Sequence, residues 1–396
     1  MATQRVSRRT FLNGGVAGFA AFAVAALSPS KTSLAEHISA PQSVLNTLGA
    51  LLPADNNGVM LPAGFQSKIV ARSGQSPTAN GSYAWHGAPD GGACFPTEEG
   101  GWVYVSNSEL SNRAGGAGAL RFSPTGEVVD AYPILQNSSN NCAGGATPWQ
   151  TWLSCEESER GMVYECDPLG IKPPQLRAAL GAFWHEAVAV HLASGYLYLT
   201  EDARDGGFYR FRPQNEASDL SAGILEIAAV KSKGGRNFID WLTVPDPSAV
   251  VIPTRHQLDA SSVFAGGEGI SIFSDKAYFT TKRDNRVWCF DLISQELTVL
   301  YDIQTSANPL LSGVDNIVIS PAGDVIVAED RGNMQLVALT ADHLVVPLIK
   351  VIGQDRSEIT GPAFSPDFQR LYFSSQRGRG GSSSDGLTYE ISAIGS

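Results

Sequence analysis

The chain has 396 residues, of which 43% are hydrophobic, and its 39 acidic and 28 basic side chains leave a net charge of −11. This length is ample for a large hydrophobic core, and the acidic balance disfavours nucleic acid and anionic membrane surfaces as partners. Retention of cations is favoured wherever the acids cluster.

Residues 1–35 have the features of an export signal. A twin arginine in SRRTFL (7–12) precedes the apolar stretch GGVAGFAAFAVAALS (14–28), and small residues follow up to Ala35. This order is typical of a twin-arginine signal peptide, and the apolar stretch is too short for a stable membrane span, so a membrane anchor is the disfavoured alternative. We therefore expect a bacterial protein that the twin-arginine translocation machinery exports, periplasmic or secreted, with no stable membrane span.

After an N-terminal arm at 36–64, six segments share one pattern of two or three apolar residues followed by a polar end. They are VYVSNSE (103–109), TWLSCEE (151–157), LYLTED (197–202), AYFTTKR (277–283), VIVAEDR (325–331) and LYFSSQR (371–377). Aligned on Asn107, Cys155, Glu201, Thr281, Glu329 and Ser375, they recur at intervals of 48, 46, 80, 48 and 46 residues. The shorter intervals match a four-stranded propeller blade, and the long one holds a blade plus an insertion at 231–262.

This repeat predicts an all-β fold, a six-bladed β-propeller over residues 65–396. The last blade lacks a fourth strand because the chain stops, and FQSKIVARS (65–73) is expected to supply it and so to close the ring. A β-sandwich is the alternative, but it does not explain the regular intervals.

Acidic residues recur at one phase of the repeat. The first-strand starts WHEAVAV, GGEGISI and VDNIVI place Glu186, Glu268 and Asp315 at equivalent positions of three neighbouring blades. The second-strand ends contribute Glu109, Cys155, Glu156, Glu157, Glu201, Asp202, Glu329 and Asp330. Both sets are expected at one mouth of the central channel, where converging like charges need counter-ions.

These residue types indicate a mixed metal site. Carboxylate oxygens suit calcium, whereas a thiolate suits a softer transition metal such as iron or zinc. The five cysteines are an odd number, so at least one is unpaired or bound to metal. For any single acid, an ordinary surface turn remains the alternative.

Several strings resemble the PhoX-type alkaline phosphatase family: TPWQTWLSCEE (147–157), FWHEAVAV (183–190), YLTED (198–202), GGEGI (266–270) and DNIVIS with GDVIVAED (315–330). The resemblance implies a six-bladed propeller with an iron–calcium cluster (Fe³⁺ and Ca²⁺) that hydrolyses phosphate monoesters outside the cytoplasm. Carried over by motif, the iron ligands would be Cys155, Glu186, Glu268 and Asp315. The calcium candidates would be Glu156, Glu157, Glu201, Asp202, Glu329, Asp330 and Glu109.

One position departs from the family pattern. Gly266 stands where the family has an arginine that is expected to face the phosphate. Lys282, Arg283 and Arg377 are the predicted catalytic cations that replace it, with Arg331 and Arg379 as further loop cations at the same face. Two other functions stay open: a calcium-dependent lactonase or esterase, which needs neither thiolate nor iron, and a metal-stabilised binding propeller without catalysis.

The insertion at 231–262 connects two blades on the side of the carboxylates. Its length and apolar content predict a segment that caps the channel mouth, with Arg255 or His256 as a substrate contact. The alternative is an ornament folded away from the mouth.

Overall fold

The computed structural model describes residues 43, 45–330 and 333–395. Within these residues the protein is all-β, and its only helices are the short 3₁₀ segments η1 (Leu45–Thr47), η2 (Ala178–Leu180), η3 (Thr254–His256) and η4 (Ser383–Asp385). None of the helices in this part of the chain has the length and apolar character that a membrane crossing requires. The predicted signal at 1–35 lies outside the described residues.

The strands form five antiparallel sheets. The first contains β3 (Pro89–Pro96), β4 (Trp102–Ser108), β5 (Gly115–Phe122) and β6 (Val128–Ser138), and the second contains β7 (Gly145–Ala146), β8 (Trp152–Cys155), β9 (Val163–Cys166) and β10 (Gln175–Leu176). The third has nine strands: β11 (His185–His191), β12 (Tyr196–Glu201), β13 (Phe208–Pro213), β14 (Gly223–Lys233), β15 (Arg236–Thr243), β16 (Gly267–Phe273), β17 (Lys276–Thr281), β18 (Arg286–Asp291) and β19 (Glu296–Asp302).

The last two sheets include the N-terminal strands. The fourth combines β20 (Val314–Ile319), β21 (Val325–Glu329), β22 (Gln335–Leu339) and β23 (Val345–Val351) with β1 (Val59–Met60). The fifth combines β24 (Ile359–Phe364), β25 (Arg370–Ser375) and β26 (Leu387–Ala393) with β2 (Phe65–Arg72).

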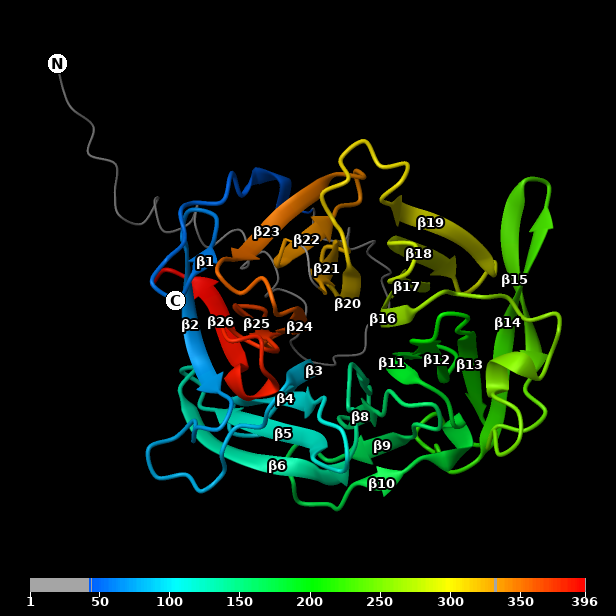
Figure 1. Ribbon diagram of the computed structural model, residues 1–396, viewed down its shortest axis with the longest axis horizontal. Helices are drawn as coiled ribbons and strands as arrows, with labels where there is room; N and C mark the ends of the chain where they lie inside the picture. Colours follow the sequence, from blue (N-terminus) through cyan, green and yellow to red (C-terminus); the bar gives the residue numbers. More distant parts are fainter. Residues whose placement is uncertain (1–42, 44, 331–332, 396) are drawn as a thin grey trace, which may run out of the picture.

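The sheets stand around a common centre (Figure 1). The strands β3, β11, β16, β20 and β24 lie nearest to this centre, and β6, β10, β19 and β23 lie at the outside. Each central strand contacts the next one around the ring, in the order β3, β7, β11, β16, β20 and β24, and β24 contacts β3 again. The prediction of an all-β, propeller-like arrangement is therefore confirmed.

The division into sheets differs from the prediction, because two expected blades belong to one nine-stranded sheet. The insertion forms β15, which continues the hairpin from β14 and also pairs with β19 through Asn237 and Phe238. This strand joins the outer edges of the runs β11–β14 and β16–β19. Sequence spacing locates an insertion, but it does not reveal that the insertion adds a strand between neighbouring runs.

The N-terminal strand β2 completes the sheet that contains the last strand of the chain. It pairs with β26 from Phe65 opposite Ala393 to Arg72 opposite Leu387. The pairing covers the edge of β26, as the sequence predicted, and β2 becomes the outer strand of the sheet.

An aromatic cluster packs the two runs of the nine-stranded sheet against each other. The ring of Phe208 in β13 stacks on that of Phe279 in β17, with centroids 4.4 Å apart and planes at 14°. Phe264, Trp241 and Phe290 surround Phe208 at 5.6–6.0 Å. Burial of these large rings stabilises the contact between the runs.

We expect the substitution Phe208→Ala to lower the free energy of unfolding by about 3–5 kcal/mol, because it empties a fully buried ring site. Urea unfolding followed by tryptophan fluorescence measures this loss. Ile293→Ala is the control, because Ile293 is 72% exposed and its truncation changes stability by less than about 0.5 kcal/mol. Equal stability of the two variants would contradict the role given to the cluster.

Candidate metal centre

The strand register identifies equivalent positions at one end of the channel. We call each series of consecutive antiparallel strands that corresponds to one predicted blade a run. In each of the six runs, the last residue pair between the first and second strands at this end of the channel is Pro89–Ser108, Asn141–Glu156, His185–Glu201, Gly267–Thr281, Val314–Glu329 and Ile359–Ser375. The sequence alignment placed Asn107 and Cys155 where the register places Ser108 and Glu156. The alignment was therefore wrong by one residue in the first two runs.

The next residue on each first strand forms what we call the first-strand ring: Asp90, Cys142, Glu186, Glu268, Asp315 and Thr360. In four runs the register shifts directly after the final pair, so Asp90, Glu186, Glu268 and Asp315 sit in β-bulges. A bulge bends the strand and re-aims its side chains. As a result, Glu186, Glu268 and Asp315 each place an oxygen within 4.8 Å of the others while remaining buried.

The next residue on each second strand forms the second-strand ring: Glu109, Glu157, Asp202, Lys282, Asp330 and Gln376. Members of the two rings meet in two more clusters with ligand atoms within 4.8 Å, namely Glu109–Cys142–Glu157 and Asp90–Glu109–Glu358. Glu358 joins from the residue preceding β24, where it forms an isolated bridge with Asp330.

Three of the predicted calcium ligands hold turns instead of facing the rings. The carboxylates of Glu156, Glu201 and Glu329 each accept a hydrogen bond from the main-chain N–H six residues later, at 3.2, 2.8 and 3.1 Å. Each acceptor therefore fixes the turn that leads into the third strand. Glu201 also accepts from Tyr209 Oη and pairs with Arg255, so both of its oxygens are used by protein donors.

The structure brings Cys142, which the sequence analysis did not select, to the carboxylates. Cys155 is fully buried and packs among Leu153, Val163 and Phe183. Successive side chains of a strand point to opposite faces, so a one-residue error in phase exchanges a channel-facing position for a core position. Cys142 precedes Glu156 by 14 residues, the same interval as from Asp315 to Glu329, and this spacing was the available signal. All five cysteines are free.

The main chain that carries the ring residues is fixed by the neighbouring run. The side chain opposite a bulge donates a hydrogen bond to the carbonyl of the next run's ring residue, in the pairs Asn107–Cys142, Thr200–Glu268 and Thr280–Asp315. The first of these bonds measures 2.7 Å and the last 2.6 Å. The ligand atoms are thus positioned by contacts between runs as well as by the register within each run.

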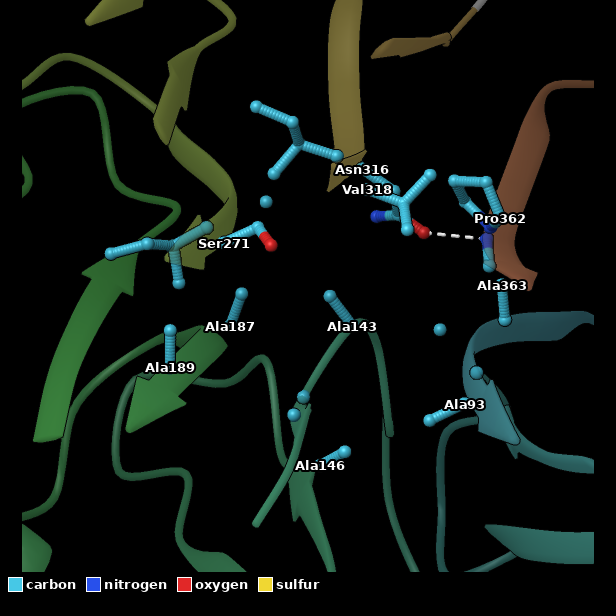
Figure 2. A pocket seen from close by; sticks show the side chains of 18 of the residues that line it. Ala93, Ala143, Ala146, Ala187, Ala189, Ser271, Asn316, Val318, Pro362 and Ala363 are labelled. Atoms are coloured by element: carbon cyan, nitrogen blue, oxygen red, sulfur yellow. Dashed lines mark hydrogen bonds between the residues drawn. The ribbon is translucent and has the colours of Figure 1, made fainter. Parts of the chain in front are cut away.

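Small residues line the channel next to the first-strand ring. Figure 2 shows Ala93, Ala143, Ala187 and Asn316 around this space, whose volume is about 340 Å³. A Cβ on Gly145 would lie 1.8 Å from the Val188 carbonyl oxygen, so the first strands approach too closely there for a side chain. This close approach brings the first-strand ring together.

The electrostatics of the site favour a bound cation. Both carboxylate oxygens of Glu186 lack a hydrogen-bond partner in the described part of the chain. Burial, supported by the charge of Glu268, raises the pKa of Glu186 well above its usual value. Burial likewise raises the pKa of Glu157 to about 9, with a contribution from Asp202. Buried carboxylates without protein donors are the ligand set that a hard cation such as calcium takes.

Three predicted cations have distinct surroundings. Lys282 Nζ lies 2.7 Å from Glu268 Oε1, and Arg377 Nη1 lies 2.8 Å from Glu358 Oε1. Arg283 is exposed, and its Cγ lies 3.0 Å from where a Cβ on Gly266 would be. Arg331 lies outside the described residues.

The predicted substrate contacts of the insertion are in ion pairs. Arg255 contacts Glu201 and Asp205 at 2.9 Å each, and His256 Nε2 lies 2.6 Å from Asp205 Oδ2. This part of the insertion therefore reaches the turn that follows β12, while β15 lies between β14 and β19.

Fold and site together define a propeller-like β-protein with clustered carboxylates at one end of its channel. The family model described as alkaline phosphatase PhoX matches residues 90–168, 158–291 and 293–378, and the chain therefore belongs to this family. This finding confirms the resemblance noted in the sequence.

Solved structures support the same fold. PhoX of Pseudomonas fluorescens, in complex with the transition state analogue vanadate, aligns with a TM-score of 0.72 at 16% identity, over 87% of this chain and 97% of that one. A protein of unknown function from Bacteroides thetaiotaomicron aligns with a TM-score of 0.52 at 10% identity, over 83% and 76%. A comparison with curated proteins finds no match.

The adjacent residues Glu201 and Asp202 provide a matched test of the two acid positions. Glu201→Gln is expected to cost about 3 kcal/mol of stability, because it removes the charge of a fully buried carboxylate that pairs with Arg255, while calcium content stays unchanged. Asp202→Asn is expected to weaken calcium binding at least tenfold, because it removes a negative charge that offsets Lys282 beside the clustered carboxylates. Thermal unfolding and calorimetric calcium titration measure the two effects. If Glu201→Gln instead weakened calcium binding and Asp202→Asn lowered stability, Glu201 would be the residue that binds calcium.

Stability after chelation should depend on pH. The pKa of Glu157 rises from 4.5 to about 9 on folding, so the native state binds this proton more tightly than the unfolded chain. The stability of the chelated protein is therefore expected to fall as the pH rises from about 4.5 to about 9. Melting temperatures at pH 5.5 and 8.5 measure this slope, and Glu157→Gln should reduce it. A chelated protein that is more stable at pH 8.5 would contradict the assignment.

Proposed function

We propose that the protein hydrolyses phosphate monoesters with a cluster of metal ions held at the mouth of a six-bladed propeller. The observation that carries this proposal is the convergence of Glu186, Glu268 and Asp315, three buried carboxylates from three successive runs. Membership of the alkaline phosphatase PhoX family supports the reaction class.

The six-bladed assignment follows from counting runs instead of sheets. The nine-stranded sheet contains two four-stranded meanders, β11–β14 and β16–β19, connected by β15. Each meander supplies one residue to each ring, as the four-stranded parts of the other sheets do. The insertion strand thus joins two blades at their outer edges.

We propose iron and calcium as the bound metals. The thiolate side, with Cys142 beside Glu109 and Glu157, suits iron, and the all-carboxylate cluster Asp90–Glu109–Glu358 suits calcium. Glu186, Glu268 and Asp315 lie between these sides and are proposed as shared ligands. When bound, such ions neutralise phosphoryl oxygens and lower the pKa of a water molecule. Cys155, the thiolate expected from the sequence, is the comparison residue in the test below.

Arg283 and Arg377 are the proposed contacts of the phosphoryl group. The side chain of Arg283 lies directly over Gly266, the position of the family arginine, and it therefore provides a guanidinium near the missing one. Arg377 is held by Glu358 and leaves further N–H donors for a phosphate oxygen. Lys282 is directed at carboxylates, so we propose that it influences the phosphoryl group through the metal centre. These cations orient the ester and stabilise its developing charge.

The proposal includes export of the protein before it acts. The twin arginine at Arg8 and Arg9 and the apolar stretch at 14–28 support a twin-arginine signal peptide, and so a periplasmic or secreted phosphatase. N-terminal sequencing of the protein recovered from the periplasm would test cleavage after residue 35.

The test of the proposed function is turnover of p-nitrophenyl phosphate by chelated protein and by protein reloaded with calcium and iron. We expect activity only after reloading, and a loss of at least about 100-fold in kcat for Cys142→Ser through loss of the metal ligand. Cys155→Ser, a substitution in the core, should retain the bound iron. Metal content is measured on the same samples.

Other outcomes would overturn the proposal. Turnover of a lactone panel without turnover of phosphate esters would identify a lactonase. A metal-loaded protein that turns over neither class would be a binding propeller. Loss of iron from Cys155→Ser but not from Cys142→Ser would return the ligand role to Cys155.

A further inference from the structure

We infer that the ammonium group of Lys282 is a permanent cation of the metal centre, which fills the corner between Glu268, Asp202 and Asp330 in place of a metal ion. Lys282 is the only basic residue among the twelve positions of the two rings, all of which the structure describes. Four of the other five positions of the second-strand ring carry carboxylates. The second-strand ring thus contains one positive charge among four carboxylates.

Three carboxylates converge on this ammonium. Its Nζ lies 2.7 Å from Glu268 Oε1, 3.4 Å from Asp330 Oδ2 and 3.7 Å from Asp202 Oδ2. An ammonium group has three N–H donors and no acceptor, so three surrounding carboxylates match its capacity. The contact to Glu268 is the shortest and involves an almost fully buried carboxylate.

The backbone fixes the position of Lys282. Its N–H donates to the Gly266 carbonyl at 2.7 Å, directly before the bulge that carries Glu268. The preceding residue, Thr281, pairs with Gly267 and accepts a hydrogen bond from Trp288 Nε1 at 2.9 Å. The side chain therefore starts from a fixed point at the edge of the cluster.

Occupation of this corner determines where metal ions can bind. A divalent ion among the same three carboxylates would lie close to the ammonium and be repelled by it. The clusters Glu109–Cys142–Glu157 and Asp90–Glu109–Glu358 share no residue with the three partners of Lys282, and the cluster Glu186–Glu268–Asp315 shares only Glu268 with them. Metal ions are thus directed to the side of the rings that lies away from Lys282, and their number is one lower than the carboxylates alone would hold.

The inference rests on the proposed metal centre but not on phosphatase activity, so its test counts metal ions. Wild-type, Lys282→Met and Lys276→Met proteins are chelated, reloaded with excess calcium and iron, freed of unbound metal and analysed by mass spectrometry of the metals. Lys276 is the matched control, because it begins the same strand β17 and is exposed. We expect Lys282→Met to retain about one more divalent ion per chain than the other two proteins.

Two results of this count would overturn the inference. An equal count in Lys282→Met and wild type would do so while leaving the metal centre in place. A wild-type protein that takes up no metal would remove both the inference and the proposed centre.

A second measurement uses the unmodified sequence and so does not depend on folding of the variant. Acetylation rates of Lys282 and Lys276 in the wild-type protein are followed by peptide mass spectrometry, with calcium and after chelation. We expect Lys282 to react at least tenfold more slowly than Lys276 in both conditions, because its ammonium stays engaged. Acceleration of Lys282 to the rate of Lys276 upon addition of calcium would show that metal displaces the ammonium, and would overturn the inference.

Discussion

The repulsion between buried carboxylates is the constraint on which this structure depends. Glu186, Glu268 and Asp315 place oxygens within 4.8 Å of one another, and all three residues are buried. Such a cluster persists only if bound cations or protons balance its charge and if the backbone prevents it from spreading. Three features hold the backbone in place: the bulges, the hydrogen bonds between runs and the close glycine contact along the channel.

Neighbouring acids in this chain have different tasks. In the Glu–Glu pair at 156–157 and the Glu–Asp pairs at 201–202 and 329–330, the first carboxylate binds the main chain of the following turn and the second belongs to the second-strand ring. The first acid supports the second, because a turn that is held by one acid places the next acid at a fixed position. Two adjacent acids at a strand end therefore indicate one residue that holds the turn and one that belongs to the second-strand ring, in that order.

The sequence allowed the propeller-like architecture and the three bulge acids to be predicted, because both depend on spacing that repeats along the chain. It did not allow the phase in the first two runs to be predicted, because β8 is short and an alternating pattern cannot be read from four residues. Asp90 was missed because its strand contains glycine and proline in place of the usual apolar alternation. Glu358 was missed because a bridge to Asp330, far away in the sequence, brings it to the site.

The pairing of β2 with β26 also has a consequence for the order of events during biosynthesis. The strand at 65–72 has its partner at 387–393, so it cannot pair until residues 387–393 have been synthesised. Until then β2 lacks its partner β26 and exposes backbone groups that can pair with other chains. Ring closure therefore comes late in synthesis, and a truncation that removes only the seven-residue strand β26 leaves β2 and β25 each with an unpaired edge.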